Sequence, residues 1–502
     1  MHSKKESQKS KLFVFASLAL IVSLGCLCVP GGLNLTGTPE VVSTVTSTSQ
    51  PAPADTSQPV TTDQPQPVLT ENPVPGITLN ADGSWLLIET AQGLWAANPD
   101  GDNLVQLTTV DYWRGEIKQA IQPTGNHVVF LTPGDYDFHH LALNLLSLPD
   151  GKITKITDLT SAATEAYADL SPGDPGFEAM RAIGETTSYA WSPDGTRLAF
   201  SGVMDGPSAD IYLYDVSTGA ITRVSQDPAQ DFAPSWSPDG EHLLYLAAES
   251  FGTGAGWSMS GIWAADGAGA NAAELLATNT AGEEIVGWLD NTTAVLATWA
   301  QPCGLQRLRL YDLNSFKVTV LNKDCFVSAA ADGKYGAALY STADGIYMVT
   351  TDNRKPAKVS SDGDAFIEPR RAGDQLFTVR FSGGGIATFG NISDFDHQVS
   401  PVKGRFEELD LAEYGAIWGW TSKNASQPGV WITGPGVEIG QIYDGPASHP
   451  IWSEHNNLLF FADQDSGGYA IYLITFDSHY TDLHQVNTIE DEPIRVAWLG
   501  GE

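Results

Sequence analysis

Residues 189–202 read YAWSPDGTRLAFSG, and residues 233–247 read APSWSPDGEHLLYLA. Both stretches place a tryptophan before a Ser-Pro-Asp-Gly turn and follow the turn with a run of apolar residues. Proline presets φ for the first turn position, aspartate hydrogen-bonds to nearby backbone, and glycine accepts a positive φ. Each stretch is therefore predicted to form two antiparallel strands joined by a tight turn.

The pattern recurs in degenerate form from residue 77 onward, mostly at spacings of 40 to 50 residues. Periods of this size are typical of propellers, in which one repeat cannot bury both of its faces alone. Residues 189–225 contain four short predicted strands, the number found in a propeller blade. The other copies are LNADGSWLLIE from residue 79, IQPTGNHVVFL from 121, GWLDNTTAVLA from 287, AAADGKYGAAL from 329, RRAGDQLFTV from 370, AEYGAIWGW from 412 and IWSEHNNLLFF from 451.

The repeats predict a propeller directly, but they leave the number of blades open. The chain contains nine units, and RVAWLG at residues 495–500 resembles one more innermost strand. Propellers usually have four to eight blades. Either one unit is not a blade, or the last strand closes the ring beside the first unit. We expect an all-β fold with a single propeller of eight four-stranded blades, with seven or nine as alternatives.

The full motif, Trp-Ser-Pro-Asp-Gly followed two residues later by two apolar residues and an aromatic one, occurs at Trp191–Phe200 and Trp236–Tyr245. It resembles the PD40, or TolB-like, β-propeller repeat (related to WD40 repeats). That family includes extracytoplasmic scaffold proteins and the gating domains of prolyl-oligopeptidase-like peptidases. The resemblance covers roughly residues 77–502 and implies the fold, but it implies function only as a class.

Residues 1–30 have the character of an export signal. Four lysines precede an uncharged apolar run at residues 12–29. The sequence SLGC at residues 23–26 resembles a bacterial lipobox, which would make Cys26 a lipidation site. An uncleaved membrane anchor and simple secretion remain alternatives. In the first two cases the rest of the chain is anchored outside the cytoplasm.

Residues 31–76 are rich in proline, threonine and serine and nearly lack large apolar side chains. Such a segment cannot bury enough surface to offset the entropy cost of ordering, so a disordered tether is predicted. The chain carries 60 acidic against 26 basic residues, a formal charge of −34. This charge repels phosphate backbones and excludes nucleic acid as a partner. Contact with a membrane is expected only through the N-terminus.

Most of the irregular sequence is predicted to lie on the face opposite the Ser-Pro-Asp-Gly turns, because second-to-third strand loops and connections between blades open there. An insert at 158–187, in which SAATEAYADL reads as a short helix, belongs to this face. Long loops on a rigid scaffold commonly carry binding functions. The predicted ligand-binding residues are Trp113, Asp135, Asp137, His139, His140 and Trp257.

Aspartate and histidine are suitable ligands for zinc or manganese. Polar clusters are nevertheless ordinary in loops, so neither a metal nor another cofactor is predicted. The tryptophans that recur at one position of the repeat are predicted to pack between blades. Cys303 and Cys325 stand at equal distances from a hairpin turn near Asn314, and we expect them to face each other and form a disulfide.

The sequence contains no complete catalytic motif. It lacks a Walker loop, a His-Glu-x-x-His pair and a Gly-x-Ser-x-Gly nucleophile elbow, so no catalytic residue is assigned. We therefore favour a non-enzymatic binding or scaffold protein for a protein, peptide or glycan ligand. The alternative is a glycan-processing hydrolase or lyase whose active site is assembled from several blades at the channel mouth.

Overall fold

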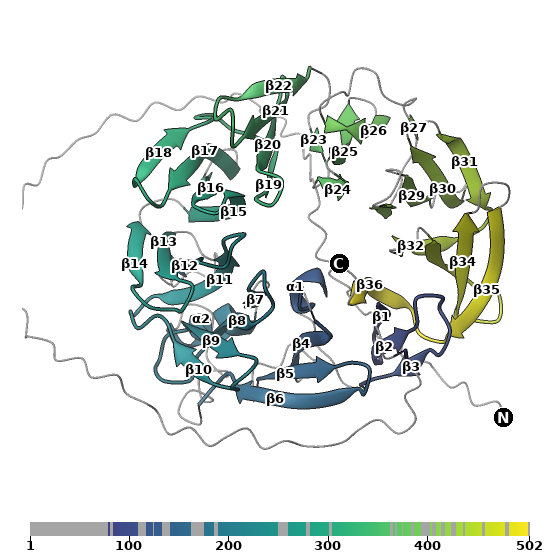
Figure 1. Ribbon diagram of the computed structural model, residues 1–502, viewed down its shortest axis with the longest axis horizontal. Coiled ribbons are helices and arrows are strands. Elements are labelled where there is room, and N and C mark those ends of the chain that lie inside the picture. The colour runs from purple at the N-terminus through teal and green to yellow at the C-terminus, as the bar shows by residue number, and fades with distance from the viewer. Residues whose placement is uncertain are drawn as a thin grey trace, which may run out of the picture. The chain divides into compact units, whose positions relative to one another are not determined.

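The computed structural model shows nine β-sheets arranged around a central axis (Figure 1). It describes residues 79–80, 84–108, 117–123, 125–132, 141–161, 175–184, 189–248, 260–277, 282–300, 304–361, 365–366, 369–373, 375–382, 386–392, 402–403, 408–412, 417–422, 428–434, 437–453, 457–476 and 481–499. We call the sheets blades 1 to 9 in chain order.

The strands of the first five blades are these. Blade 1 contains β1 (Trp85–Thr90), β2 (Gly93–Ala97), β3 (Val105–Gln106) and β36 (Pro493–Leu499). Blade 2 contains β4 (His127–Thr132), β5 (Ala142–Ser147) and β6 (Lys152–Asp158). Blade 3 contains β7 (Tyr189–Trp191), β8 (Arg197–Gly202), β9 (Asp210–Asp215) and β10 (Ile221–Arg223). Blade 4 contains β11 (Gln230–Trp236), β12 (His242–Ala248), β13 (Ser260–Asp266) and β14 (Ala273–Leu276). Blade 5 contains β15 (Gly282–Asp290), β16 (Thr293–Ala300), β17 (Gly304–Asp312) and β18 (Lys317–Val320).

The remaining four blades follow in the same way. Blade 6 contains β19 (Ser328–Asp332), β20 (Ala337–Thr342), β21 (Gly345–Thr350) and β22 (Ala357–Ser360). Blade 7 contains β23 (Ala365–Phe366), β24 (Arg370–Ala372), β25 (Gln375–Ser382), β26 (Ile386–Asn391) and β27 (Val402–Lys403). Blade 8 contains β28 (Leu409–Leu411), β29 (Trp418–Ser422), β30 (Gly429–Gly434) and β31 (Val437–Tyr443). Blade 9 contains β32 (Ala447–Trp452), β33 (Leu458–Asp463), β34 (Tyr469–Phe476) and β35 (Thr481–Ile489).

The Ser-Pro-Asp-Gly turn is held by its own side chains. Ser192 Oγ donates to Asp194 Oδ1 at 2.6 Å, and the same carboxylate oxygen accepts from the Thr196 backbone N–H at 3.1 Å. Ser192 Oγ in turn accepts from the Arg197 backbone N–H at 2.9 Å, and Gly195 has a φ of 68°. Blade 4 repeats these bonds with Ser237, Asp239, Glu241 and His242. Local turn chemistry therefore sets this corner independently of the rest of the ring.

The recurring tryptophans connect neighbouring blades, as predicted. The indole N–H of Trp236 donates to the Ala190 carbonyl of blade 3 at 3.1 Å. The indole N–H of Trp288 donates to Ser235 Oγ of blade 4 at 3.1 Å. Both side chains are buried. Each tryptophan thus joins the innermost strand of its blade to that of the preceding blade.

Every pair of adjoining blades shares an apolar core. Leu213 of blade 3 packs in one cluster with Tyr245 of blade 4, and Leu310 of blade 5 packs with Tyr340 of blade 6. Further clusters join blades 4 to 5, 6 to 7, 7 to 8, 8 to 9 and 9 to 1, and the largest covers blades 1 to 3. Burial between sheets rather than within one sheet therefore stabilises the ring.

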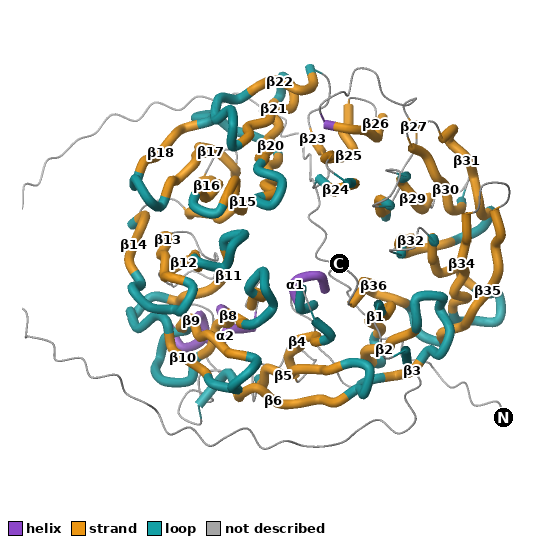
Figure 2. The backbone as a smooth tube through the Cα atoms, in the orientation of Figure 1, coloured by secondary structure: helices purple, strands orange, loops and turns teal. Residues whose placement is uncertain are grey.

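The ring has nine blades, one more than the favoured number and within the range that the repeats allowed. The C-terminal strand β36 lies beside β1 (Figure 2). The two strands pair antiparallel, and Leu86 lies opposite Trp498. The alternative in which the last strand closes the ring beside the first unit is thus confirmed. The segment RVAWLG supplies the innermost strand of blade 1 and not a tenth blade.

Blade 2 departs from the four-stranded pattern. Its sheet has three described strands, and the short helix α1 (Ile117–Ala120) contacts β4, β7 and β36 near the position of an innermost strand. The helix predicted at residues 161–170 lies, apart from residue 161, outside the described residues. The described part of the insert instead contains α2 (Pro175–Gly184), which packs against β8 and β11.

The predicted signal segment with Cys26, and the predicted tether, lie outside the described part of the chain. Among the residues that the structure does describe, no helix is both long enough and apolar enough to span a membrane.

Candidate functional site

The blades present two chemically different faces. Because successive strands of a blade are antiparallel, its first and third turns open on one side, which we call the turn face. The second loop of each blade and the connections between blades open on the opposite side, which we call the loop face. A cavity lies on the turn face, and a polar cluster lies on the loop face.

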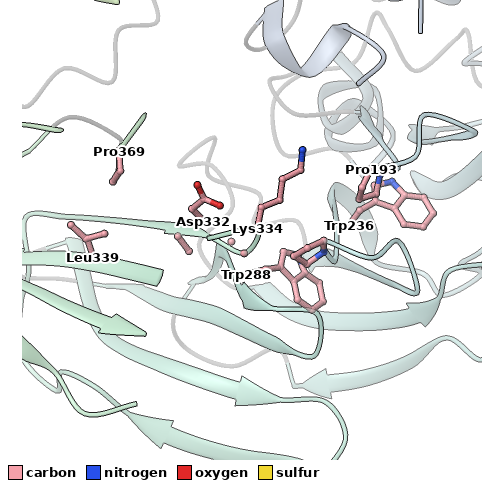
Figure 3. A pocket seen from close by; sticks show the side chains of 11 residues that line it. Pro193, Trp236, Trp288, Asp332, Lys334, Leu339 and Pro369 are labelled. Atoms are coloured by element: carbon pink, nitrogen blue, oxygen red, sulfur yellow. The ribbon is translucent and has the colours of Figure 1, made fainter. Parts of the chain in front are cut away.

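The turn face contains a cavity of about 300 Å³. It is lined by residues from the turns and inner strands of blades 3 to 7 (Figure 3). The residues that line it are Pro193, Trp236, Pro238, Gly287, Trp288, Ala331, Asp332, Gly333, Lys334, Leu339 and Pro369. This volume is at the lower end of the range for small-ligand sites.

Two of these glycines allow the walls to approach each other. A Cβ on Gly333 would lie 2.4 Å from Pro238 Cγ, so a side chain there would collide with the turn of blade 4. A Cβ on Gly287, whose φ is 147°, would lie 3.3 Å from the Cβ of Ala331. The first of these contacts joins blades 6 and 4, which are not neighbours in sequence, and the second joins the neighbouring blades 5 and 6.

The lining is mainly apolar and offers few groups for chemistry. The indole N–H groups of Trp236 and Trp288 already donate to the preceding blades, so the rings present only carbon surface to the cavity. The charged lining residues are Asp332 and Lys334. Asp332 Oδ1 accepts from the Tyr335 backbone N–H at 2.9 Å and so shapes its turn. Aromatic and proline surface beside one exposed ammonium suits binding of a peptide better than acid–base catalysis.

The loop face contains a buried acidic cluster at the junction of blades 3 and 4. Asp210 and Asp231 are fully buried, and Asp227 is half-buried. Arg223 donates to Asp210 Oδ2 at 2.7 Å. Tyr245 is also fully buried, and its hydroxyl has no hydrogen-bond partner among the described residues. Sequence reasoning missed this cluster, because single aspartates at strand starts look like turn residues.

Burial controls the protonation of this cluster. Burial raises the pKa of Asp210 to about 7, and the nearby Arg223 offsets part of that rise. Burial, together with the negative charges of Asp227 and Asp210, also raises the pKa of Asp231 well above its usual range. Both shifts favour the neutral, protonated form of these two carboxyl groups. Asp210 and Asp231 are buried within the junction of blades 3 and 4.

The acidic cluster predicts that stability falls as pH rises. Between the unfolded pKa near 4 and the raised folded pKa values, the folded chain binds more protons than the unfolded chain. The cluster therefore contributes most stability below about pH 4, and it loses that contribution as pH rises through about 7. Asp231→Asn is expected to raise the melting temperature at pH 8 by about 2 °C and to change it little at pH 4. Thermal unfolding across this pH range measures the effect, and Asp465→Asn on the exposed surface is the control. An unchanged pH profile in Asp231→Asn would contradict the assignment.

The ligand-binding residues predicted from sequence stay predictions. Trp113, Asp135, Asp137, His139, His140 and Trp257 all lie outside the described residues. Within the described ranges, no three histidine, cysteine or acidic side chains form a group that could hold a metal ion.

Cys325 forms a disulfide, but its predicted partner Cys303 lies outside the described residues. The pairing itself therefore stays a prediction. Cys325 itself forms a β-bridge with Gln306. In the hairpin, Arg309 lies opposite Val320, so an even ladder would place residue 304 opposite residue 325. The bridge to Gln306 shows that the register shifts between these two positions.

Comparison with known proteins gives partial matches. No family model matches the chain. The Tol-Pal system protein TolB of Alcanivorax borkumensis is 42% identical over 105 residues, which are 20% of this chain and 24% of that protein. The uncharacterized peptidase YuxL of Bacillus subtilis is 37% identical over 59 residues, which are 12% of this chain and 9% of the peptidase.

Among solved structures, oligogalacturonate lyase from Vibrio parahaemolyticus aligns with a TM-score of 0.40 at 12% identity, covering 80% of this chain and 99% of the lyase. The matched segments span at most about a quarter of the two curated relatives, so they concern the repeat and not the whole proteins. Together with the Trp-Ser-Pro-Asp-Gly repeats and the ring of sheets, the match to TolB shows that this chain is a β-propeller whose repeats are similar to those of TolB.

Proposed function

We propose that this chain is a non-catalytic binding or scaffold protein for a protein or peptide partner. The observation that carries this proposal is the turn-face cavity, whose walls are two indole rings, three prolines and a single exposed lysine. Such surfaces bind extended or proline-containing segments through apolar contact. Similarity to a protein of the Tol-Pal system supports a protein as the partner.

The proposal includes a location outside the cytoplasm. The lysine-flanked apolar run at residues 12–29 would direct export, and either that run or a lipid on Cys26 would anchor the chain. The segment 31–76 would then act as a spacer between the membrane and the propeller. Growth with a radioactive fatty acid tests the lipid anchor. The original chain should become labelled, and the Cys26→Ser variant should not.

Site-specific crosslinking tests where the partner binds. A photo-crosslinking amino acid at position 334 in the full chain is expected to capture one protein in envelope extracts. The same group at Trp257 tests the predicted loop-face site, and at Lys155, exposed on the outermost strand of blade 2, it is the control. Equal capture from positions 334 and 155 would contradict a turn-face site, and capture from 257 alone would move the site to the loop face.

The alternative is a glycan-processing hydrolase or lyase with a site at the channel mouth. The described acidic cluster does not favour it, because its two central carboxylates are fully buried. Incubation with anionic and neutral oligosaccharides, followed by mass analysis of the products, distinguishes the two functions. Turnover that is lost in His139→Ala or Asp135→Asn would replace the binding proposal with the enzymatic one.

A further inference from the structure

The outermost strand of blade 5, β18, is an open sheet edge with an unusual composition. Its sheet has the order β15-β16-β17-β18, so one side of β18 has no neighbouring strand within the blade. The exposed fractions are 69% for Phe316, which precedes the strand, 43% for Val318 and 50% for Val320. Val318 and Val320 alternate along the strand and so project from one face of the edge, and Phe316 lies in the turn that precedes them.

No other outer strand in the described part of the ring has this character. The nearest case is β35, which has one large apolar side chain, Leu483, at 37% exposure. An open edge with exposed apolar side chains is normally avoided, because it pairs with other chains. Phe316 adds strain, since it has a φ of 56° that bulky residues rarely adopt. An exposed aromatic side chain in this conformation therefore calls for an explanation beyond folding.

The backbone of β18 leaves hydrogen-bonding groups free for a partner strand. The Leu321 N–H donates to the Leu308 carbonyl at 2.9 Å, so residue 321 faces inward to β17. Hydrogen-bonding direction alternates along an antiparallel strand, which turns the N–H and C=O groups of Val318 and Val320 toward the open edge. The edge can therefore accept one more strand.

The segment of sequence that contains this edge is basic in an otherwise acidic protein. Residues 304–361 contain eight basic and five acidic residues, whereas the whole chain has a formal charge of −34. On the other side of β18, a cavity of about 330 Å³ is lined by Lys317, Arg354 and Lys355, beside Asp312 and Asp352. Arg354 is already paired with Asp290 at 3.0 Å and with Asp312 at 3.4 Å, so Lys317 and Lys355 supply most of the attraction.

We infer that β18 binds an extended acidic segment of a protein partner as an added antiparallel or parallel strand. The partner's apolar side chains would cover Phe316, Val318 and Val320, and its carboxylates would lie near Lys317 and Lys355. A second copy of this chain fits less well, because it would bring the same lysines together and would join two strongly acidic molecules. This surface is separate from the turn-face cavity, so the inference goes beyond the proposed function.

Binding of model peptides to the full chain tests the inference. The probe is a fluorescent seven-residue peptide that alternates glutamate with valine, compared with a lysine–valine alternation and with four glutamates followed by three valines. Only the alternating acidic peptide is expected to bind. On saturation, hydrogen exchange at the amides of Val318 and Val320 should slow at least about tenfold, because these groups become paired.

Three variants separate binding from folding. Phe316→Asn removes the exposed ring and suits the left-handed backbone, so it should fold normally and bind about tenfold more weakly. Val320→Pro removes a donor that faces the open edge and should abolish binding while leaving the β17–β18 ladder intact. Leu483→Thr on β35 is the matched control and should bind like the original chain.

Each contrary result overturns the inference. Equal binding by Val320→Pro and the original chain, unchanged amide exchange at Val318 and Val320, or no binding of the acidic peptide at millimolar concentration would each do so. A concentration-dependent dimer that Phe316→Asn disrupts would identify a second copy as the occupant instead. None of these results depends on crosslinking at position 334. Failure of the strand-binding inference and failure of the turn-face proposal are therefore distinguishable.

Discussion

Deletion of Pro493–Leu499 is expected to lower the free energy of unfolding by about 5 kcal/mol or more, which is much of the stability of a typical domain. The strand β36 closes the ring against β1, and its Ala497 and Leu499 belong to the core that covers blades 1 to 3. Without it, β1 becomes an open edge and the junction of blades 9 and 1 loses its inner strand.

Side-chain contacts reinforce this closure. Trp498 donates its indole N–H to the Trp452 carbonyl at 2.7 Å, and Arg495 pairs with Glu89 at 3.3 Å. Urea unfolding followed by tryptophan fluorescence measures the effect. A peptide with the sequence DEPIRVAWLG, added to the shortened chain, should restore part of the stability, and a scrambled peptide should not.

The control for this deletion lies within the same strand. Ile494 is 48% exposed, so Ile494→Ala should change stability by less than about 0.5 kcal/mol. If the shortened chain unfolds at the same urea concentration as the original, closure by β36 does not stabilise the ring.

Arg309→Met is expected to lower the free energy of unfolding by about 3–5 kcal/mol. The Arg309 guanidinium forms an ion pair with Glu283, and the two side chains are only 12% and 6% exposed. It also donates to Thr298 Oγ1 at 3.0 Å. Burial and the charge of Glu283 raise the pKa of the adjacent Glu284, which shows how poorly this region tolerates negative charge. Removal of the cation leaves a buried carboxylate without its counter-charge.

A double variant and an exposed pair make this prediction specific. Glu283→Gln combined with Arg309→Met removes both charges and should recover most of the lost stability. Arg354→Met breaks ion pairs of a side chain that is 41% exposed, and it should cost less than about 1 kcal/mol. Both variants are compared by urea unfolding. If Arg309→Met and Arg354→Met lower the free energy of unfolding equally, burial does not set the strength of the ion pair between Arg309 and Glu283.

The proposed binding function uses surfaces with different chemistry. The turn-face cavity presents indole and proline surface, and the edge of blade 5 presents free backbone groups beside lysines. Both suit extended polypeptide segments, which is consistent with a scaffold that engages more than one part of a partner. The predicted loop-face residues, among them Asp135 and His139, form a third candidate surface.

The sequence alone determined the repeat, the four-stranded blade and the packing role of the tryptophans. These features depend on residues close together in the chain, such as Ser192, Asp194 and Gly195, whose turn bonds form locally. Alternation of apolar residues along a strand is likewise a local property. This is why the two complete motifs sufficed to predict the fold.

Only the tertiary structure decided the nine-bladed closure, the turn-face cavity, the acidic cluster and the exposure of β18. Each of these depends on the distance between residues far apart in the chain, such as Leu86 and Trp498, or Pro238 and Gly333. A single aspartate at a strand start gives no sign that a ring neighbour will bury it. Exposure of Val318 and Val320 likewise depends on what adjoining blades leave uncovered, which no local pattern encodes.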